Sequence, residues 1–224
     1  GNLLTTLAIV GESLILGFSL TLLNGITSFF WSFFSSIGEE ASDLQSRELN
    51  DDELSKLSIL ILFDLDEEKL KTLKQKYPMN LEGYLSNDSN ITKCISESDL
   101  IIGSVYLTGK KAPTIITRSM LEQIKPGTVL VDISIDQGGC FETSKPTTHQ
   151  DPTFLIDDIL HYCVSNMPGA VPLTASESLN SASLSYVQKL ANNDLNLLLN
   201  EQDFKSGLNI MAGEFRHPSL IDII

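Results

Sequence analysis

The sequence is poor in the residues that several classes of protein require. Only 15 lysines and arginines accompany 29 aspartates and glutamates, which gives a formal net charge of −14. Nucleic-acid surfaces need clustered cations for the phosphates, so this balance argues against a nucleic-acid partner. The three cysteines, Cys94, Cys140 and Cys163, lie far apart without a CxxC pair. Neither a disulfide framework nor a metal site is therefore indicated, and a reducing, cytoplasmic compartment is expected.

Charged residues are also missing from a long stretch near the start of the chain. Between Ser13 and Gly38 no side chain is charged, and the segment is long and apolar enough to span a bilayer. Serine, threonine and asparagine are frequent in it, however, and no lysine or arginine precedes Arg47 to set an orientation. We therefore favour a buried or interface helix in residues 13–38, with a membrane segment as the alternative.

The following segment, residues 38–56, is acidic and polar and has no long apolar run. This composition indicates a solvated linker or a surface helix. Residues 1–56 are accordingly interpreted as an apolar helical segment plus an acidic linker. The chain starts with Gly1 rather than methionine, which suggests a processed or partial product.

Beyond residue 56, short apolar runs alternate with helical patterns. LSILILFD, residues 57–64, has strand length and ends in an acid, and the leucines after it form a helical stripe that Pro78 stops. The same order recurs, with helices in 91–99 and 117–124, strands in 99–107 and 128–135, and a turn at Pro126 and Gly127. This alternation predicts an α/β fold with a Rossmann-like, doubly wound parallel sheet.

The last part of the chain mixes one more strand candidate with helices. FLIDDILHYCV, residues 154–164, is apolar enough for a further strand. Residues 174–193 carry apolar side chains on one helical face and begin with threonine and serine, which cap helices well. The remaining tail is expected to form a short helix with a loose end.

A candidate site follows the strand predicted in residues 128–135. Asp136-Gln137-Gly138-Gly139 places a carboxylate, an amide and two flexible residues at the carboxyl end of that strand. In open α/β sheets, ligands bind at this edge. Taken alone, the motif is more often a sharp turn with an incidental acid.

The surrounding sequence resembles a known family. CFETSKPTTHQDPTFLIDDILHYCVSNMPGAVP, residues 140–172, closely resembles the alanine dehydrogenases, which are relatives of the NAD-binding subunit of proton-translocating transhydrogenase. Residues 99–127 are similar to the same family in the same register. The resemblance covers roughly residues 57–195 and is absent from residues 1–56. It implies an NAD-binding Rossmann-like domain in 57–172 and, in 173–224, a C-terminal helical segment that returns toward a substrate domain.

The resemblance also implies an activity. The family catalyses the reversible NAD-linked oxidative deamination of L-alanine to pyruvate and ammonia, as a homo-oligomer that is expected to be a hexamer. The first alternative is a catalytically incomplete nucleotide-binding or oligomerisation fragment of the family. The second, a transhydrogenase NAD-binding domain, is disfavoured because PTTHQDPT and HYCV are closer to alanine dehydrogenase.

Individual residues inherit roles from this resemblance. Asp64 ends a strand where dinucleotide folds place a carboxylate for the adenosine ribose hydroxyls, and it would repel the 2′-phosphate of NADP, which favours NAD. Asp136 matches the family's catalytic aspartate, a carboxylate that orients water and exchanges protons. The remaining candidates are cofactor contacts, along the cofactor at Ser86 and Val105 and on the nicotinamide side at Ile133, Asn166 and Met167.

One expected motif is missing. A glycine-rich GxGxxG loop should precede Asp64 by about 20 residues. No glycine occurs between Gly38 and Gly83, and Gly11, Gly17, Gly25 and Gly38 never form GxG. We therefore expect the first βα unit of the sheet to be absent or altered beyond recognition. Residues 1–56 also offer no match to the histidine, arginine and lysine of the family's substrate domain, so this chain alone is not expected to turn over L-alanine at an ordinary rate.

Two histidines attract attention without indicating chemistry. His161 lies in an apolar run, where it is expected to donate to a backbone carbonyl rather than to act in catalysis. His149 belongs to the PTTHQDPT segment, and the sequence shows no role for it.

Overall fold

The computed structural model describes residues 6–10, 59–76, 81–107 and 109–221 of the 224-residue chain. Residue contacts divide the chain into a sheet unit, residues 1–107 and 111–165, and a C-terminal unit, residues 108–110 and 166–224. The division falls before Asn166, whereas the sequence placed the end of the dinucleotide-binding domain at Pro172. The helix expected in residues 13–38 and the acidic linker after it lie outside the described residues.

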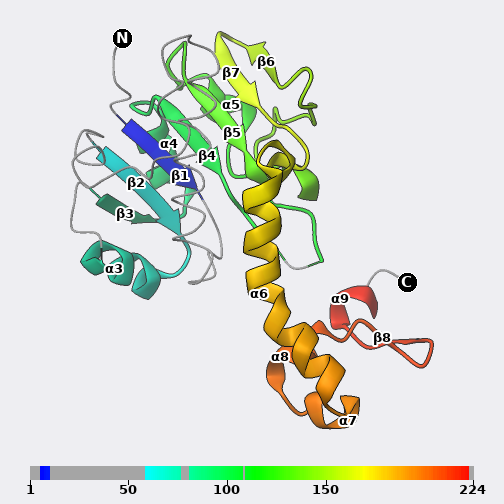
Figure 1. The fold of residues 1–224 in the computed structure, drawn as a ribbon. Coiled ribbons are helices and arrows are strands. Elements are labelled where there is room, and N and C mark those ends of the chain that lie inside the picture. Colours follow the sequence, from blue (N-terminus) through cyan, green and yellow to red (C-terminus); the bar gives the residue numbers. More distant parts are fainter. Residues whose placement is uncertain (1–5, 11–58, 77–80, 108, 222–224) are drawn as a thin grey trace. The chain divides into compact units, whose positions relative to one another are not determined.

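The sheet unit is built on seven strands in the order β3-β2-β1-β4-β5-β7-β6 (Figure 1). Neighbouring strands are parallel, except that β6 pairs antiparallel with β7 at one edge. Because the order runs outward from β1 in both directions, the sheet is doubly wound, as predicted. The strands are β1 (Thr6–Val10), β2 (Ile59–Asp64), β3 (Leu81–Leu85), β4 (Leu100–Gly103), β5 (Val129–Asp132), β6 (Thr153–Ile156) and β7 (Ile159–Tyr162).

The presence of β1 corrects a prediction. We expected the first βα unit to be absent or unrecognisable, but β1 pairs in parallel with both β2 and β4. In the sequence its five residues, TLAIV, merge with a longer apolar stretch, and residues 11–58 separate β1 from its partner β2. Strand formation here depends on pairing between distant segments, which a local pattern does not encode. The helix and the phosphate loop that would complete this unit lie outside the described residues.

Helices cover both faces of the sheet. On one face, Leu70 of α3 (Glu67–Lys76) packs over Gly83, where an added Cβ would lie 3.4 Å from the leucine side chain. Gly83 is in register with Leu62, so α3 covers the face on which Leu62 lies. The adjacent strand residues Ile61 and Phe63 point the other way, into the main hydrophobic cluster.

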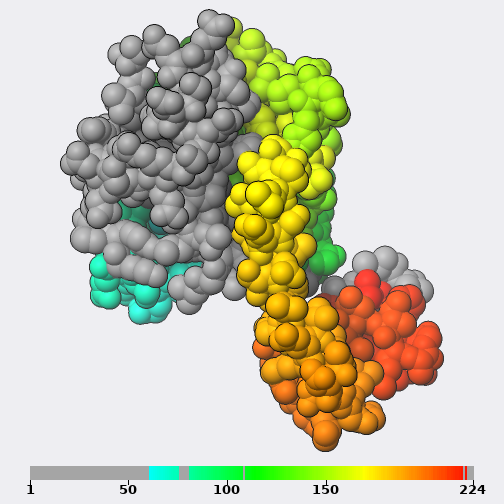
Figure 2. Space-filling view, in the orientation of Figure 1, coloured from blue at the N-terminus to red at the C-terminus, as the bar shows by residue number. Residues whose placement is uncertain are grey.

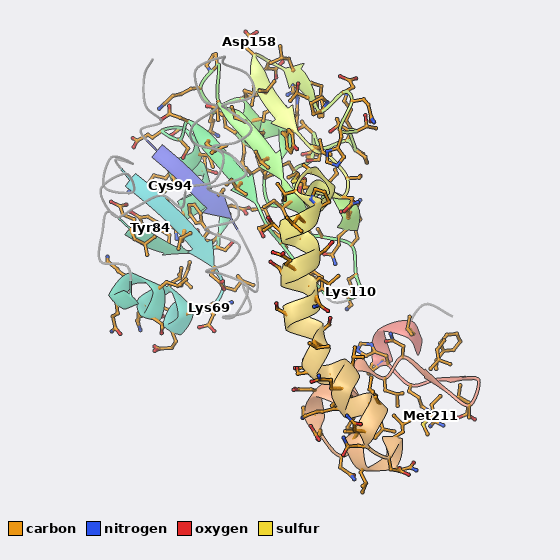
Figure 3. The ribbon with its side chains drawn as sticks, in the orientation of Figure 1. Lys69, Tyr84, Cys94, Lys110, Asp158 and Met211 are labelled. Atoms are coloured by element: carbon orange, nitrogen blue, oxygen red, sulfur yellow. The ribbon has the colours of Figure 1, made fainter. Side chains whose placement is uncertain are left out.

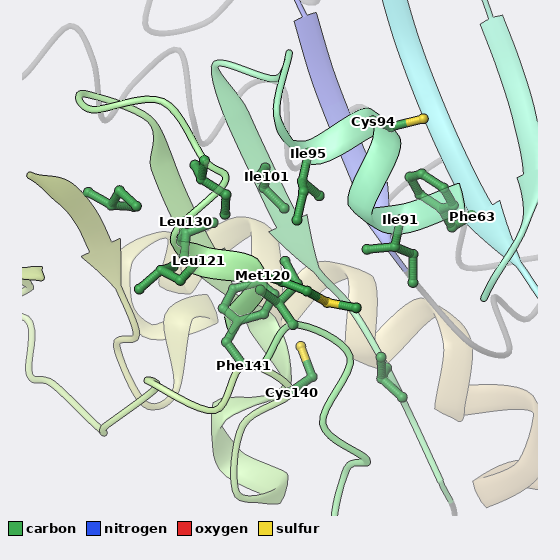
Figure 4. Close-up of a cluster of buried hydrophobic side chains, with 14 of the residues drawn as sticks. Phe63, Ile91, Cys94, Ile95, Ile101, Met120, Leu121, Leu130, Cys140 and Phe141 are labelled. Atoms are coloured by element: carbon green, nitrogen blue, oxygen red, sulfur yellow. The ribbon is translucent and has the colours of Figure 1, made fainter. Parts of the chain in front are cut away.

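That cluster lies under α4 (Asp88–Ile95) and α5 (Arg118–Leu121) (Figure 4). Both helices begin at side-chain caps, because Asn87 accepts from the Asn90 N–H and Thr117 accepts from the Met120 N–H. Their apolar residues meet one side chain from each of several strands. The cluster includes Phe63, Ile91, Ile95, Ile101, Leu121, Leu130, Cys140 and Phe141.

Two local predictions need adjustment and one is confirmed. The strand expected through Ile135 stops at Asp132, and residues Ile133–Gln137 form a 3-10 helix, η2. The apolar run in 154–164 is a hairpin rather than one strand, since Asp157 and Asp158, with φ of 52° and 60°, turn β6 into β7 (Figure 3). The turn at Pro126 and Gly127 is confirmed by the bond from the Thr128 N–H to the Lys125 carbonyl and by a φ of 87° at the glycine.

The C-terminal unit consists mainly of helices. η3 (Met167–Ala170) leads into the 21-residue helix α6 (Pro172–Asn192), which matches the helix predicted in 174–193. The tail is more ordered than predicted, with α7 (Leu195–Leu198), α8 (Gln202–Gly207), the β8 (Ile210–Met211) and β9 (Glu214–Phe215) hairpin, and α9 (Pro218–Ile221). Along its length α6 lies at the surface in Figure 2. None of the helices in the described part of the chain is both long and apolar enough to cross a membrane.

Candidate functional site

Most of the candidate residues gather at one edge of the sheet. Asp64 is the last residue of β2, Ser86 follows β3, and Val105 follows β4. Ile133 and Asp136 lie in η2, directly after β5. Because these strands are parallel, their carboxyl ends meet at the same edge, where open α/β sheets bind ligands. The sheet topology thus brings these five residues to the edge that the sequence predicted.

Asp64 is held in a defined position at the end of β2. Asp66 caps α3 by accepting from the Glu68 and Lys69 N–H groups, which directs the first turn of this helix back toward the strand end. The Lys69 ammonium then lies 3.3 Å from Asp64 Oδ2, while the Asp66 N–H donates to Asp64 Oδ1 at 2.9 Å. The pair is largely buried, with side-chain exposures of 12% for Lys69 and 4% for Asp64.

Within the described residues, the Asp64 carboxylate has two polar partners. A carboxylate has about four lone-pair sites, and the Asp66 N–H and the Lys69 ammonium occupy two of them. An ammonium beside the carboxylate also supplies donors to hydroxyl oxygens. Ser86 is fixed to the same place, since its N–H donates to the Asp64 carbonyl at 3.0 Å.

Val105 is anchored by Ser134 of η2. The Val105 N–H donates to the Ser134 hydroxyl oxygen at 2.7 Å, and that hydroxyl donates to the Val105 carbonyl at 2.9 Å. Both residues are buried. The reciprocal pair ties the segment after β4 to the segment after β5, so the main chain at Val105 and the turn that carries Asp136 are positioned together.

Asp136 lies exposed in η2, which two glycines terminate. Gly138 and Gly139 have φ of 95° and 79°, a left-handed conformation that side chains rarely adopt. Their N–H groups donate to the carbonyls of Ile135 and Ser134 and close the turn. An exposed carboxylate on a fixed turn is suited to orient a water molecule and to accept a proton from it.

Gln137 adds an unusual feature beside Asp136. Its Nε2 donates to the Leu107 carbonyl at 3.5 Å, which orients the amide. Its Oε1 is buried, and within the described part of the chain it has no hydrogen-bond partner. A buried acceptor without a donor is costly unless a ligand or water completes it.

The remaining candidates belong to the C-terminal unit. Asn166 has a left-handed backbone, with φ of 55° and ψ of 50°, and immediately precedes η3, which begins with Met167. The side chain of Asn166 is exposed and makes no capping hydrogen bond to η3.

His161 has the structural role that the sequence predicted, and no role was predicted for His149. His161 is fully buried, and its Nδ1 lies 3.0 Å from the Ile159 carbonyl, so this nitrogen donates, as expected. Its Nε2 then accepts from the Thr143 hydroxyl at 2.8 Å, and the ring stacks on Phe154. Burial lowers the pKa of His161, which keeps the ring neutral and structural. His149 lies exposed in the loop before β6.

The cysteines of the sheet unit are unreactive in this environment. Cys94, Cys140 and Cys163 are free and buried. Burial raises the pKa of the Cys163 thiol to about 11 and raises the pKa of the Cys140 thiol further. A thiol that stays protonated is a weak nucleophile, so neither cysteine is a candidate for covalent catalysis.

Two residues beside the candidate positions escaped the sequence analysis. Lys69 is one of several lysines on a helix with a polar sequence, and Ser134 alternates with isoleucines as a strand residue would. For Lys69, the signal in the sequence was its position five residues after Asp64. The role of Ser134 depends on a partner 29 residues away in the chain.

The fold and the site together define a class of protein. A doubly wound parallel sheet whose second strand ends in a buried carboxylate is a Rossmann-type dinucleotide-binding domain. The transhydrogenase from Sinorhizobium meliloti has the same fold, with a TM-score of 0.60 at 15% identity over 94% of this chain and 52% of that chain.

The chain belongs to the alanine dehydrogenase/PNT family, since the family model described as "Alanine dehydrogenase/PNT, C-terminal domain" matches residues 57–218. An alanine dehydrogenase from Halomonas elongata is 45% identical over 155 residues, which cover 69% of this chain and 42% of that protein. One from Staphylococcus saprophyticus is 39% identical over 73% of this chain and 44% of its own length. A solved L-alanine dehydrogenase matches with a TM-score of 0.66 and 32% identity over 97% of this chain and 54% of that chain. The chain thus spans less than half the length of these two sequence relatives.

Membership implies a nicotinamide dinucleotide cofactor, and the described residues fit one. The Asp64 and Lys69 pair offers an acceptor and donors to ribose hydroxyls, and Gln137 Oε1, which no described residue bonds, is an acceptor at the same sheet edge. The residues directly after β1, the position at which such folds hold the pyrophosphate, lie outside the described residues.

Proposed function

We propose that this chain is the cofactor-binding part of an NAD-dependent L-alanine dehydrogenase. The observation that carries the proposal is the placement of Asp64 and Asp136 at the carboxyl edge of one parallel sheet, on opposite sides of β1. This is the arrangement that binds a dinucleotide across the point where the strand order reverses. The adenosine end then lies toward β2 and β3, and the nicotinamide end toward β5.

In this proposal, different residues contact different parts of the cofactor. Asp64 and Lys69 hold the adenosine ribose, Ser86 and Val105 contact the cofactor along its length, and Ile133, Asp136, Asn166 and Met167 lie on the nicotinamide side. Asp64 would repel a 2′-phosphate, so NAD is preferred. Because Lys69 lies 3.3 Å from Asp64 and offsets part of that repulsion, the preference over NADP is expected to be moderate.

The proposed reaction is the reversible oxidative deamination of L-alanine to pyruvate and ammonia. A bound nicotinamide would supply the acceptor for the hydride that leaves the substrate Cα. Asp136 accepts a proton from the water that attacks the resulting imine carbon, and returns it as ammonia leaves. The η2 turn holds the Asp136 carboxylate in an exposed position, where substrate water reaches it.

A second candidate function is a nucleotide-binding or oligomerising chain without turnover of its own. The composition of residues 1–56 favours it, because positioning the substrate needs groups beyond Asp136 and this segment does not match the histidine, arginine and lysine of the family's substrate domain. Both candidates require NAD to bind at the same edge, so binding is the first quantity to measure.

Titration calorimetry with NAD tests the binding site. Asp64→Asn removes the charge from an acceptor of the ribose hydroxyls, so we expect the affinity for NAD to fall about tenfold. Asp99→Asn, the same change at the amino end of β4, should leave affinity unchanged. NADP should bind more weakly than NAD to the parent chain. Equal NAD affinity of the parent and Asp64→Asn would show that the ribose is held elsewhere.

A further inference from the structure

Asp132, the last residue of β5, is a buried carboxylate with an unusual set of partners. It is fully buried, and its Oδ2 accepts from the Ser144 hydroxyl at 2.5 Å, the Cys140 N–H at 2.8 Å and the Phe141 N–H at 3.4 Å. The Cys140 thiol donates to Oδ1 at 3.4 Å. These donors are neutral groups, and all of them belong to residues 140–144.

The donors therefore come from the segment that follows the η2 turn. Asp132 stands immediately before η2, and Cys140 stands immediately after the two glycines that end it. The carboxylate thus joins the two ends of the seven-residue turn that carries Asp136. With both ends fixed, and the Gly138 and Gly139 N–H groups bonded inside the turn, few conformations remain to it.

Two glycines make room for this arrangement. Gly103 is in register with Asp132, and a Cβ there would lie 2.3 Å from Cys140 Sγ and 2.7 Å from the Phe141 ring. A Cβ at Gly139 would lie 2.9 Å from Asp132 Oδ2. The close approach of Cys140 and Phe141 to β4 is what brings their N–H groups within reach of the carboxylate.

The same network reaches the next strand. The Ser144 hydroxyl, which donates to Asp132, also accepts from the Cys163 thiol at 3.8 Å. Cys163 directly follows β7 and is fully buried. Asp132 therefore connects the ends of β5 and β7, and among the described residues none of its hydrogen bonds reaches the segments after β2 and β3.

We propose that Asp132 is a positioning residue, whose buried carboxylate sets the geometry of the Asp136 turn and with it the nicotinamide half of the cofactor site. The inference rests on the proposed function. It requires that binding of the nicotinamide end depends on Asp132. Binding of the adenosine end should depend on Asp64 and its neighbours and should be independent of Asp132.

A comparison of two ligands separates these halves. ADP-ribose contains the adenosine, both phosphates and the second ribose of NADH but lacks the nicotinamide. In the folded 224-residue chain, Asp132→Asn removes the charge that the loop donors share, so we expect NADH affinity to fall about tenfold. The affinity for ADP-ribose should stay within about twofold, and the fluorescence of bound NADH should shift toward that of free NADH.

Ser144 supplies a milder and matched pair of variants. Ser144→Ala removes one donor and keeps the carboxylate, so it should lower the NADH to ADP-ribose affinity ratio by a smaller factor of about three. Ser144→Thr keeps the hydroxyl and should restore the ratio. If Asp132→Asn does not fold, the ratio measured in these two variants decides the question.

Each outcome has a distinct meaning. A parent chain that binds neither ligand rejects both the proposed function and the inference. If the parent binds both ligands with equal affinity, or the variants lower both affinities by the same factor or change neither, only the inference is overturned and Asp132 is purely structural.

Discussion

The sheet unit and the C-terminal unit differ in how far they bury their apolar side chains. In the sheet unit, Ile101 and Leu130 have no exposed surface. In α6, Leu173 and Leu179 are 72% and 69% exposed, and no residue of this helix is buried. Burial contributes stability roughly in proportion to the apolar area removed from water. The sheet unit is therefore stabilised by its own core, whereas the apolar face of α6 contributes little within the described part of the chain.

The candidate site follows the same division. The residues with an anchored geometry, Asp64, Val105 and the turn around Asp136, all belong to the sheet unit, where Asp64, Val105 and the Ser134 side chain that bonds Val105 are buried. The polar contacts of α6 are exposed, such as the ion pair of Lys189 with Glu201, and exposed pairs contribute little to stability. Precise positioning thus coincides with a packed core.

The largest expected effect is on the free energy of unfolding, when a leucine is replaced by alanine in each of the two units. Leu130→Ala empties space in the main cluster and should lower the free energy of unfolding by about 2 to 5 kcal/mol. Leu179→Ala removes an exposed side chain and should change it by less than about 0.5 kcal/mol. Urea unfolding followed by circular dichroism measures both. Similar losses would mean that α6 is covered in solution and that the contrast between the units is weaker.

Two glycines sharpen the comparison with effects of opposite sign. Gly103→Ala forces a Cβ against Cys140 and Phe141 and should destabilise the chain by about 1 to 3 kcal/mol. Gly207→Ala, in α8, meets nothing within 4 Å and should stabilise its unit by about 0.4 to 1 kcal/mol, because it restricts the unfolded chain. Thermal unfolding of the two variants decides the signs. A neutral Gly103→Ala would contradict the close packing of the loop on β4.

A smaller effect is expected from pH, since the sheet unit buries His161 while His217 of the C-terminal unit is only half-buried. Burial lowers the folded-state pKa of His161 below its ordinary value of 6.5. As the pH falls below about 6.5, the unfolded chain takes up a proton that the folded chain does not, so stability decreases. His161→Gln should lose this part of the pH dependence in unfolding measurements at pH 7.5 and 5.5. An unchanged difference between the two pH values would assign the dependence to other groups.

Much of the sheet could be predicted from the sequence, and the errors in that prediction have physical causes. β2, β4 and β7 are apolar runs that end near polar or turn residues, and such runs predict buried strands. β3, with the sequence LEGYL, is an edge strand with mixed polarity and was not predicted. β5 was predicted too long, because Ile133 and Ile135 continue its β-branched pattern while the bonds from Cys140 and Phe141 to Asp132 turn the chain away.

The positions of the candidate residues could be predicted from the sequence, but the contacts that hold them could not. Asp64 and Asp136 follow strands, and the resemblance to a family supplied roles for them and for Ser86 and Val105. Lys69, Ser134 and Asp132 act through contacts that form only after the sheet assembles. A serine between isoleucines has no local signal that it will bond Val105, 29 residues away in the chain.

The sequence by itself determined the fold class, the edge of the sheet at which the candidate residues Asp64 and Asp136 lie, and the family, because periodicity and short motifs are local properties of the chain. The tertiary structure decided the central place of β1, the end of β5 at Asp132, and the anchoring of Asp64 and of the Asp136 turn. Each of these depends on hydrogen bonds or strand pairing between residues that meet only in the folded chain, and a buried carboxylate such as Asp132 is stable only when those partners are in place.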